Sequence, residues 1–244
     1  MLKKVSLELG GKNPLIVCDD ADLDLAVKWI CLSSYSNAGQ RCAASSRIIV
    51  FESVYDSLRK KLVEATKDLR IGPDDGDDLG PVINKRQLDK MRRYIANAGE
   101  HGADVISGGN RLEGPKYDQG WYMAPTVIEN VDPKSEISCT ELFGPIALLY
   151  KVKDFNEALT MANDSPYGLT ACIHTKDFDR AYHFTQKVRA GAAVVNAGTY
   201  GSEPHMPFGG FGQSGNGTRE PGTEALDVYC ELKDVYFQIY PERL

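Results

Sequence analysis

The pattern that most constrains the fold of this chain is a repeated alternation of short apolar runs with amphipathic segments. The apolar runs are rich in branched residues and are bounded by glycine or polar residues, which is typical of strands. Between them, apolar residues recur at helical spacing, as at Val54, Leu58, Leu62, Ala65 and Leu69. Because helices that join successive strands form crossover connections, the pattern predicts an α/β fold with a mainly parallel sheet covered by helices.

The expected elements follow one another along the chain in that alternating order. The expected strands cover residues 6–9, 14–17, 47–50, 104–107, 126–128, 146–150, 169–174 and 192–196. The expected helices cover residues 22–39, 53–72, 87–99, 154–163 and 177–188, with Asp22 and Ser53 as the N-caps of the first two.

The C-terminal end of the chain departs from this alternation. A short helical stretch at 223–229 is followed by an extended apolar segment at 231–240. A terminal strand with little chain left to cover it would leave an open sheet edge, and open edges pair readily with other strands. We therefore expect this segment to pair with another chain or subunit.

Length and charge limit the classes of function. At 244 residues the chain can form one large domain or two small ones. Its 34 acidic and 28 basic side chains give a net charge of −6, which argues against binding to nucleic acid or to an anionic membrane. The first residues do not read as a signal peptide, and no apolar run has the length of a membrane span. We expect a soluble cytoplasmic protein with neither nucleic acid nor membrane as a partner.

Six cysteines are scattered along the chain, at positions 18, 31, 42, 139, 172 and 230. None belongs to a C-x-x-C pair, and no histidine lies nearby at ligand spacing. This pattern argues against a zinc site and against a disulfide scaffold, so we expect no metal site. A functional cysteine would have to act singly.

The stretch SNAGQRCAASSR, residues 36–47, is the best candidate for a reactive thiol. The small residues around Cys42 leave its thiol accessible and leave backbone N–H groups free to stabilise an oxyanion, while the neighbouring Arg41 guanidinium favours the thiolate. The alternative is a buried structural cysteine, which is the usual state of a lone cysteine.

A thiol nucleophile usually needs a base, and Glu8 is the better candidate than any histidine. None of the four histidines lies in a stretch typical of the partner of a protease cysteine. In an apolar strand the Glu8 carboxylate would be partly desolvated, which raises its pKa and makes it a stronger base near neutral pH. The alternative of a glutamate that points to solvent from an edge strand stays open.

Four motifs around these residues occur in an order typical of one enzyme family. They are L-E-L-G-G-K at 7–12, G-Q-x-C at 39–42, E-x-F-G-P at 141–145, and Asn196 followed by P-F-G-G at 207–210. With this order and these gaps the chain resembles the aldehyde dehydrogenase superfamily from about residue 3 to about residue 240.

The resemblance implies a covalent mechanism. Cys42 would attack the aldehyde carbon to give a thiohemiacetal, from which a hydride leaves to NAD or NADP and a thioester remains. Glu8 would activate the water that hydrolyses this thioester. Relatives that pass the acyl group to coenzyme A usually lack this glutamate, so its presence favours a carboxylate product.

The remaining motif residues are implied to hold the cofactor. Glu141 resembles the residue that binds the hydroxyls of the nicotinamide ribose, and Phe143 resembles the aromatic residue that packs beside the nicotinamide. Gly10 and Gly11 would let the backbone approach the ring. Asn196 would fix loop geometry near the site, or it is simply an asparagine at the end of a strand.

The resemblance also implies a domain organisation. Residues 1–8 would be the remnant of a junction between a cofactor domain and a catalytic domain, residues 9–222 the catalytic domain, and residues 223–244 a C-terminal helix and oligomerisation strand. The chain would then be a C-terminal catalytic half without the N-terminal NAD(P)-binding domain. We therefore expect cofactor binding by the chain alone to be weakened or lost.

Three hypotheses about function stay open at this point. The chain is a catalytic half that works on a small aldehyde together with a separate cofactor-binding half, or it is a truncated form that folds without oxidising aldehydes. The third hypothesis is a non-catalytic module that associates through residues 231–240. Apolar surface on the 6–9 and 223–229 segments further predicts a homo-oligomer, as a dimer or larger.

Overall fold

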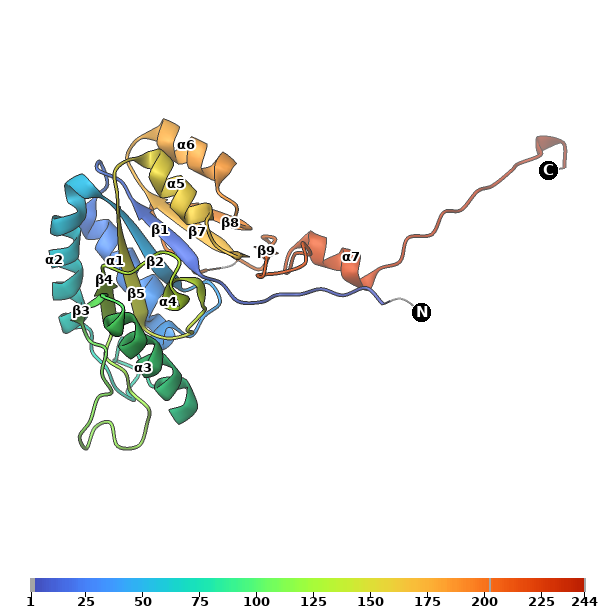
Figure 1. Cartoon of the computed structure of the whole chain (residues 1–244). Helices are drawn as coiled ribbons and strands as arrows, with labels where there is room; N and C mark the ends of the chain where they lie inside the picture. Colours follow the sequence, from blue (N-terminus) through green and yellow to red (C-terminus); the bar gives the residue numbers. More distant parts are fainter. Residues whose placement is uncertain (1–2, 202, 244) are drawn as a thin grey trace.

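The fold is built around one seven-stranded sheet, seen in a computed structural model that describes residues 3–201 and 203–243 (Figure 1). The strand order is β3-β4-β5-β2-β1-β7-β8, and all neighbouring pairs are parallel except β3 with β4. The strands of this sheet are β1 (Asn13–Val17), β2 (Ser45–Phe51), β3 (Asp104–Ser107), β4 (Thr126–Glu129), β5 (Ile146–Val152), β7 (Thr170–His174) and β8 (Ala192–Val195). The predicted α/β fold with a mainly parallel sheet is confirmed.

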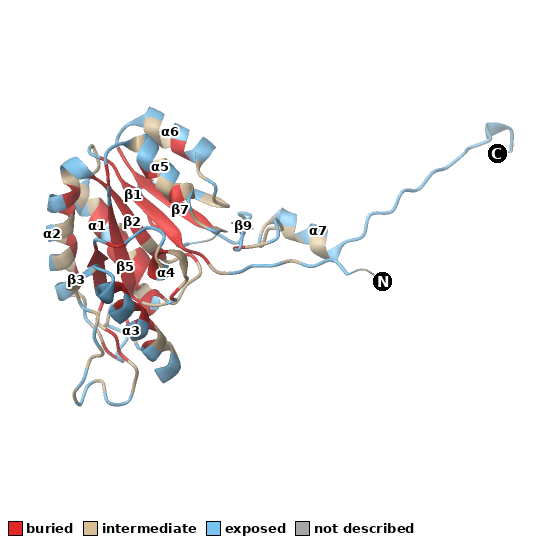
Figure 2. Cartoon of the chain, viewed as in Figure 1, coloured by how far each residue is buried: buried red, intermediate tan, exposed pale blue. Residues whose placement is uncertain are grey.

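Helices cover both faces of the sheet. Helices α1 (Leu23–Tyr35) and α2 (Glu52–Asp68) cover one face, and the other face is covered by α3 (Lys85–Glu100), α4 (Glu136–Cys139), α5 (Phe155–Asn163) and α6 (Phe178–Lys187). The central strands are buried on both sides, as Figure 2 shows. In β1, for example, Leu15 and Val17 pack toward α1 and α2, whereas Ile16 packs toward the opposite helices, and none of the three is exposed.

Smaller elements complete the chain. Strands β6 (Tyr167–Gly168) and β9 (Phe211–Gly212) form an antiparallel pair outside the main sheet. The remaining elements are α7 (Leu226–Tyr229) and the 3₁₀ helices η1 (Ser36–Gly39), η2 (Thr223–Ala225) and η3 (Pro241–Arg243). Among the described residues, no helix combines the length and the apolar character needed to cross a lipid bilayer.

The structure corrects two predicted helix boundaries. Asp22 caps α1 as expected, because its side chain accepts from the N–H groups of Asp24 and Leu25, each at 3.1 Å. The α-helix ends at Tyr35 rather than at residue 39, since Asn37 and Ala38 adopt positive φ angles and the chain continues as η1. Ser53 is not the N-cap of α2, because β2 runs directly into the helix and Phe51 occupies that position.

The predicted strand at residues 6–9 is also wrong. The segment is extended, but only Glu8 forms an isolated bridge, with Gly215, and Leu9 remains 46% exposed. It runs outside the sheet beside the segment that follows β9, where Leu9 N–H donates to the Ser214 carbonyl at 3.1 Å. The apolar run at residues 6–9 was therefore predicted to be a sheet strand, whereas it pairs with the loop that follows β9.

The C-terminal segment forms no strand within the described chain. Residues 231–240 are extended, exposed and without a neighbouring strand among the described residues, and they project away from the sheet beyond α7 (Figures 1 and 2). Their pairing with another chain stays a prediction, as do the domain boundaries at residues 8 and 222. Residues 1, 2 and 244 of the predicted terminal segments lie outside the described residues.

Candidate active site

Three loops that carry the predicted site residues meet at one end of the sheet. Residues 8–12 precede β1, residues 39–44 precede β2 and residues 141–145 precede β5. Because β5, β2 and β1 are parallel neighbours in that order, the loops before them lie together at the amino ends of the strands. This is the opposite edge from the one where open α/β sheets usually bind ligands.

Asn13 ties two of these loops to the sheet. Its amide group donates to the carbonyls of Cys42 and Ala44, both at 2.8 Å, and its carbonyl oxygen accepts from Thr170 N–H of β7 at 3.1 Å. The Asn13 residue is 1% exposed, so these bonds form away from water. Sequence analysis missed this residue, although it directly follows the L-E-L-G-G-K motif.

Cys42 lies half-buried in the loop between η1 and β2. Burial raises the pKa of its thiol, and the carboxylates of Glu141 and Glu8 raise it further, against the N–H groups of Ala43 and of Cys42 itself. The resting side chain favours the neutral thiol.

The predicted role of Arg41 as an activator of the thiol is wrong. Its guanidinium donates to Ser36 Oγ at 3.0 Å and lies over the ring of Tyr200, 4.7 Å from the centroid. The side chain is thus engaged by other groups. Accordingly, the pKa of the Cys42 thiol is raised rather than lowered.

Glu8 belongs to an exposed segment, but its carboxylate faces the protein. A Cβ atom added at Gly209 would lie 2.6 Å from Glu8 Oε1, which shows how closely the carboxylate approaches that backbone. Partial desolvation raises the pKa of Glu8, the Arg219 charge opposes this shift, and the Glu220 charge adds to it. The direction of the shift is the one expected from the sequence, although the strand that motivated the expectation does not form.

Glu141 lies directly over the two glycines of the first motif. Its Oε1 accepts from Gly11 N–H at 3.0 Å, and a Cβ atom at Gly10 would meet Oε2 at 2.2 Å. Desolvation raises the pKa of Glu141, against the N–H of Gly11 and the charges of Lys12 and Lys90. A side chain at position 10 would therefore collide with the Glu141 carboxylate as it lies in this structure.

Phe143 follows in the same loop and presents its ring to the surface. It is 40% exposed, and its backbone has a positive φ of 55°. Helix α3 holds the loop, because Gln87 donates to the Phe143 carbonyl at 3.2 Å and Lys90 donates to the Glu141 carbonyl at 3.5 Å. Sequence analysis missed Gln87 and Lys90, since no local signal distinguishes them from other polar residues of an amphipathic helix.

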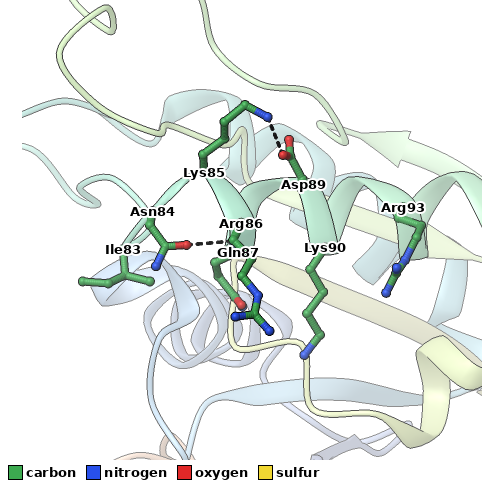
Figure 3. A pocket seen from close by; sticks show the side chains of 8 residues that line it. All are labelled: Ile83, Asn84, Lys85, Arg86, Gln87, Asp89, Lys90 and Arg93. Carbon is green, nitrogen blue, oxygen red and sulfur yellow. Dashed lines mark hydrogen bonds and ion pairs between the residues drawn. The ribbon is translucent and has the colours of Figure 1, made fainter.

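An open pocket of about 1070 Å³ runs along the first half of α3. Figure 3 shows Arg86, Gln87, Lys90 and Arg93 directed to one side of this helix, away from the Lys85–Asp89 ion pair. The pocket is large enough for a nucleotide-sized ligand. Its cationic side chains Arg86, Lys90 and Arg93 form no ion pair within residues 3–201 and 203–243, and their charge favours an anionic ligand.

Asn196 directly follows β8 at its carboxyl end, away from the three loops. Its side chain accepts from Thr175 N–H at 2.9 Å and donates to the Thr175 carbonyl at 2.8 Å. Its φ of 55° turns the chain back, and three residues later Thr199 donates to the Ala43 carbonyl at 2.7 Å, next to Cys42. The expected effect of Asn196 on loop geometry near the site stays a prediction.

Known proteins were compared with the chain as a whole. A family model described as "Aldehyde dehydrogenase family" matches residues 1–235. The chain is 40% identical over 235 residues to alpha-ketoglutaric semialdehyde dehydrogenase of Bacillus subtilis (strain 168), covering 96% of this chain and 48% of the relative. It is 43% identical over 239 residues to a mitochondrial aldehyde dehydrogenase of Leishmania tarentolae, covering 97% and 47% respectively.

Solved structures give the same result. The chain superposes with a TM-score of 0.89 on betaine aldehyde dehydrogenase from Staphylococcus aureus, which was crystallised in complex with NAD+. That match has 37% identity and covers 92% of this chain and 44% of the solved one. The chain thus spans about half the length of the relatives that it matches.

Proposed function

The chain belongs to the aldehyde dehydrogenase family, and we propose that it is the thiol-bearing catalytic portion of an enzyme that oxidises an aldehyde to a carboxylate with NAD or NADP. The observation that carries this proposal is that the loops of Glu8, Cys42 and Glu141 meet at the amino ends of β1, β2 and β5, where Gly11 N–H is bonded to Glu141 and the Asn13 amide to the Cys42 carbonyl. A nucleophile, a base and a carboxylate suited to a ribose are the groups that this reaction needs.

Cys42 acts as the nucleophile. Because its resting thiol is protonated, a base must take the proton before the sulfur adds to the aldehyde carbon. Glu8 suits this step, since its raised pKa strengthens it as a base and its exposed segment lets it return the proton to solvent. The N–H groups of Cys42 and Ala43, which lower the pKa of the thiol, are our candidates for stabilising the oxyanion of the thiohemiacetal.

The loop from Glu141 to Phe143 fits the nicotinamide end of a dinucleotide. Glu141 Oε1 is held by Gly11 N–H, so the carboxylate keeps lone pairs for ribose hydroxyls, and the exposed Phe143 ring offers an apolar face. The cationic pocket of α3, beside this loop, suits a diphosphate. When bound, NAD(P)+ supplies the hydride acceptor that converts the thiohemiacetal into a thioester.

Glu8 then completes the reaction. It takes a proton from a water molecule whose oxygen adds to the thioester carbon, and cleavage of the carbon–sulfur bond releases the carboxylate and returns the Cys42 sulfur. A base at this position therefore supports hydrolysis rather than transfer of the acyl group to a thiol such as coenzyme A.

Association with another chain is part of the same proposal. The segment beyond α7 exposes large apolar side chains, with Leu232 and Phe237 at 102% and 85% exposure. Exposed apolar segments of this kind favour burial against a second copy or a separate cofactor-binding half.

The proposal is tested by following NADH formation and the state of Cys42 together. The chain is first titrated with NAD+ by calorimetry and then mixed with aldehydes, alone and with a co-expressed cofactor-binding half. We expect Glu8→Gln to form at most one NADH per site, more slowly than the parent chain because Cys42 loses its base, and to accumulate an acyl adduct on Cys42, detected by mass spectrometry, because hydrolysis is blocked.

Two variants make the result decisive. Cys42→Ala should form no NADH. Cys230→Ala, which removes an exposed thiol just before the extended segment 231–240, should behave like the parent chain. NADH formation that survives Cys42→Ala, or the lack of any NADH in the presence of the cofactor-binding half, would refute the proposal.

A further inference from the structure

Lys12 is a buried charged residue to which the proposed reaction gives no role. It lies between Gly11 and β1, and only 2% of its surface is exposed. An ammonium group buried in this way is costly unless it loses its proton or finds a water molecule or an opposite charge.

A small cavity connects Lys12 with Glu141. It has a volume of about 20 Å³ and is lined by both residues together with Ser46 and Phe143. This is enough room for one water molecule. The hydroxyl of Ser46 is buried and has no hydrogen-bond partner within the described part of the chain, so a water there would join three polar groups.

The charges around Lys12 come from four elements of the fold. Burial lowers its pKa to about 7, far below the ordinary value of 10.5, and Arg47 of β2 and Lys90 of α3 act in the same direction. Cys139 of α4 and Glu141 in the loop before β5 act in the opposite direction. Since Lys12 in turn lowers the pKa of Glu141, the two groups titrate as a coupled pair.

We propose that Lys12 is a positioning residue that acts on the Glu141 carboxylate through a shared water molecule. The charge of Lys12 controls whether this carboxylate is held inside the protein or is free to accept hydrogen bonds from the ribose hydroxyls of the cofactor. This inference rests on the role proposed for Glu141 above. When Lys12 is charged, the ammonium and Gly11 N–H together hold the carboxylate. When Lys12 is neutral, only the Gly11 hydrogen bond remains, and the carboxylate is available to the cofactor.

The consequence is a cofactor affinity that depends on pH. Lys12 loses its proton as the pH rises through neutrality, so NAD+ should bind more tightly at about pH 8 than at about pH 6. The affinity should change by up to about tenfold, which corresponds to a shift of about one pKa unit of one group by the charge of the other. Lys12→Met, which keeps the length of the side chain without its charge, should abolish this dependence.

The titration of Lys12 can be measured without any cofactor. In the full chain with lysine ¹³C-labelled at Cε, the signal lost in Lys12→Met is assigned to Lys12. We expect its midpoint near pH 7 and expect Glu141→Gln to move it to lower pH, because a stabilising negative charge is removed. Lys60→Met, at an exposed position of α2, should leave it unchanged.

The outcomes separate this inference from the proposed function. A midpoint near that of a free lysine, or one that Glu141→Gln does not move, overturns the inference. If Lys12→Met does not fold, the Glu141→Gln comparison still decides, with Lys12→Arg used for assignment. NAD+ binding that shows no pH dependence refutes the inference alone, whereas absence of NAD+ binding at every pH, with the cofactor-binding half present, refutes the proposed function.

Discussion

At the scale of single residues, the site combines a nucleophile with two carboxylates that suppress its ionisation. Burial and the charges of Glu141 and Glu8 all raise the pKa of the Cys42 thiol. A thiol in this state resists oxidation and chance alkylation, since the thiolate is the reactive form. Reactivity is then expected only when a base is ready or when a neighbouring charge is neutralised.

Removal of one of these charges should make Cys42 more reactive. Glu141→Gln removes the carboxylate that raises the pKa of Cys42 more than Glu8 does, so this pKa falls. The rate of Cys42 alkylation by iodoacetamide at neutral pH should then rise by about twofold to fivefold. The rate is measured by mass spectrometry, with the exposed Cys230 in the same sample as the internal control. An unchanged or slower rate at Cys42 would contradict the electrostatic account.

Gly10 should not tolerate a side chain. In Gly10→Ala the new methyl group would lie 2.2 Å from Glu141 Oε2, so the carboxylate must move and NAD+ binding should be lost. Because the atoms met are the end of a flexible side chain that can move aside, we expect the free energy of unfolding, measured by urea denaturation, to change by less than about 1 kcal/mol. Gly99→Ala is the matched control, because a Cβ atom there meets nothing within 4 Å, and it should be neutral or stabilising.

The sequence predicted the residues with distinctive chemistry better than those that support them. Cys42 and Glu8 stand out because a thiol among small residues and a carboxylate in an apolar run are unusual, whereas Glu141 was singled out only through the resemblance of its motif. Asn13 and Gln87 do not stand out, because their importance lies in bonds to loops that are distant in the sequence. The orientation of Arg41 was mispredicted for a related reason: Tyr200, which its side chain contacts, is far along the chain.

At the scale of elements, the position of the site follows from the order of the strands. Loops that precede β1, β2 and β5 come together only because these strands are neighbours in the sheet. Local periodicity predicted most of the elements, since it depends on residues a few positions apart. It could not predict the neighbours of each strand, and for this reason an extended segment at residues 6–9 was assigned to a sheet that it does not join.

The bonds of Asn13 should be measurable as a contribution of these elements to stability. Asn13→Ala removes the donor to the part-buried carbonyls of Cys42 and Ala44, and we expect the free energy of unfolding to fall by about 1–3 kcal/mol. Alkylation of Cys42 should also become faster, as its loop is released from β1. Asn156→Ala, at an exposed position of α5, is the control for chemical denaturation. Equal stability of the two variants would argue against this role of Asn13.

At the scale of the whole molecule, a compact three-layer body carries an arm that is not packed against it (Figure 2). The N-terminal segment runs beside the base of this arm, where Lys4 donates to the Asp227 carbonyl at 2.9 Å. The arm is thus fixed at its base and extended beyond it. This arrangement presents residues 231–240 to another chain.

The arm should determine the state of association. We expect a dimer or larger oligomer at micromolar concentration in sedimentation velocity, because burial of the apolar side chains of the arm favours association. Joint replacement of Leu232 and Phe237 by lysine should give a monomer. Replacement of Ile83, which is 76% exposed on the body of the molecule, by lysine should leave the oligomer intact. A parent chain that sediments as a monomer would contradict this role of the arm.

The placement of the candidate site at the amino ends of the strands has a practical consequence for protein engineering. Turns at the other end of the sheet, such as the one that joins β5 to α5, are separated from Cys42 by the length of the strands. Short peptide tags or fluorescent reporters inserted into those turns would sit far from the chemistry. The same scaffold therefore offers one edge for the reaction and the opposite edge for sensors, tethers or immobilisation.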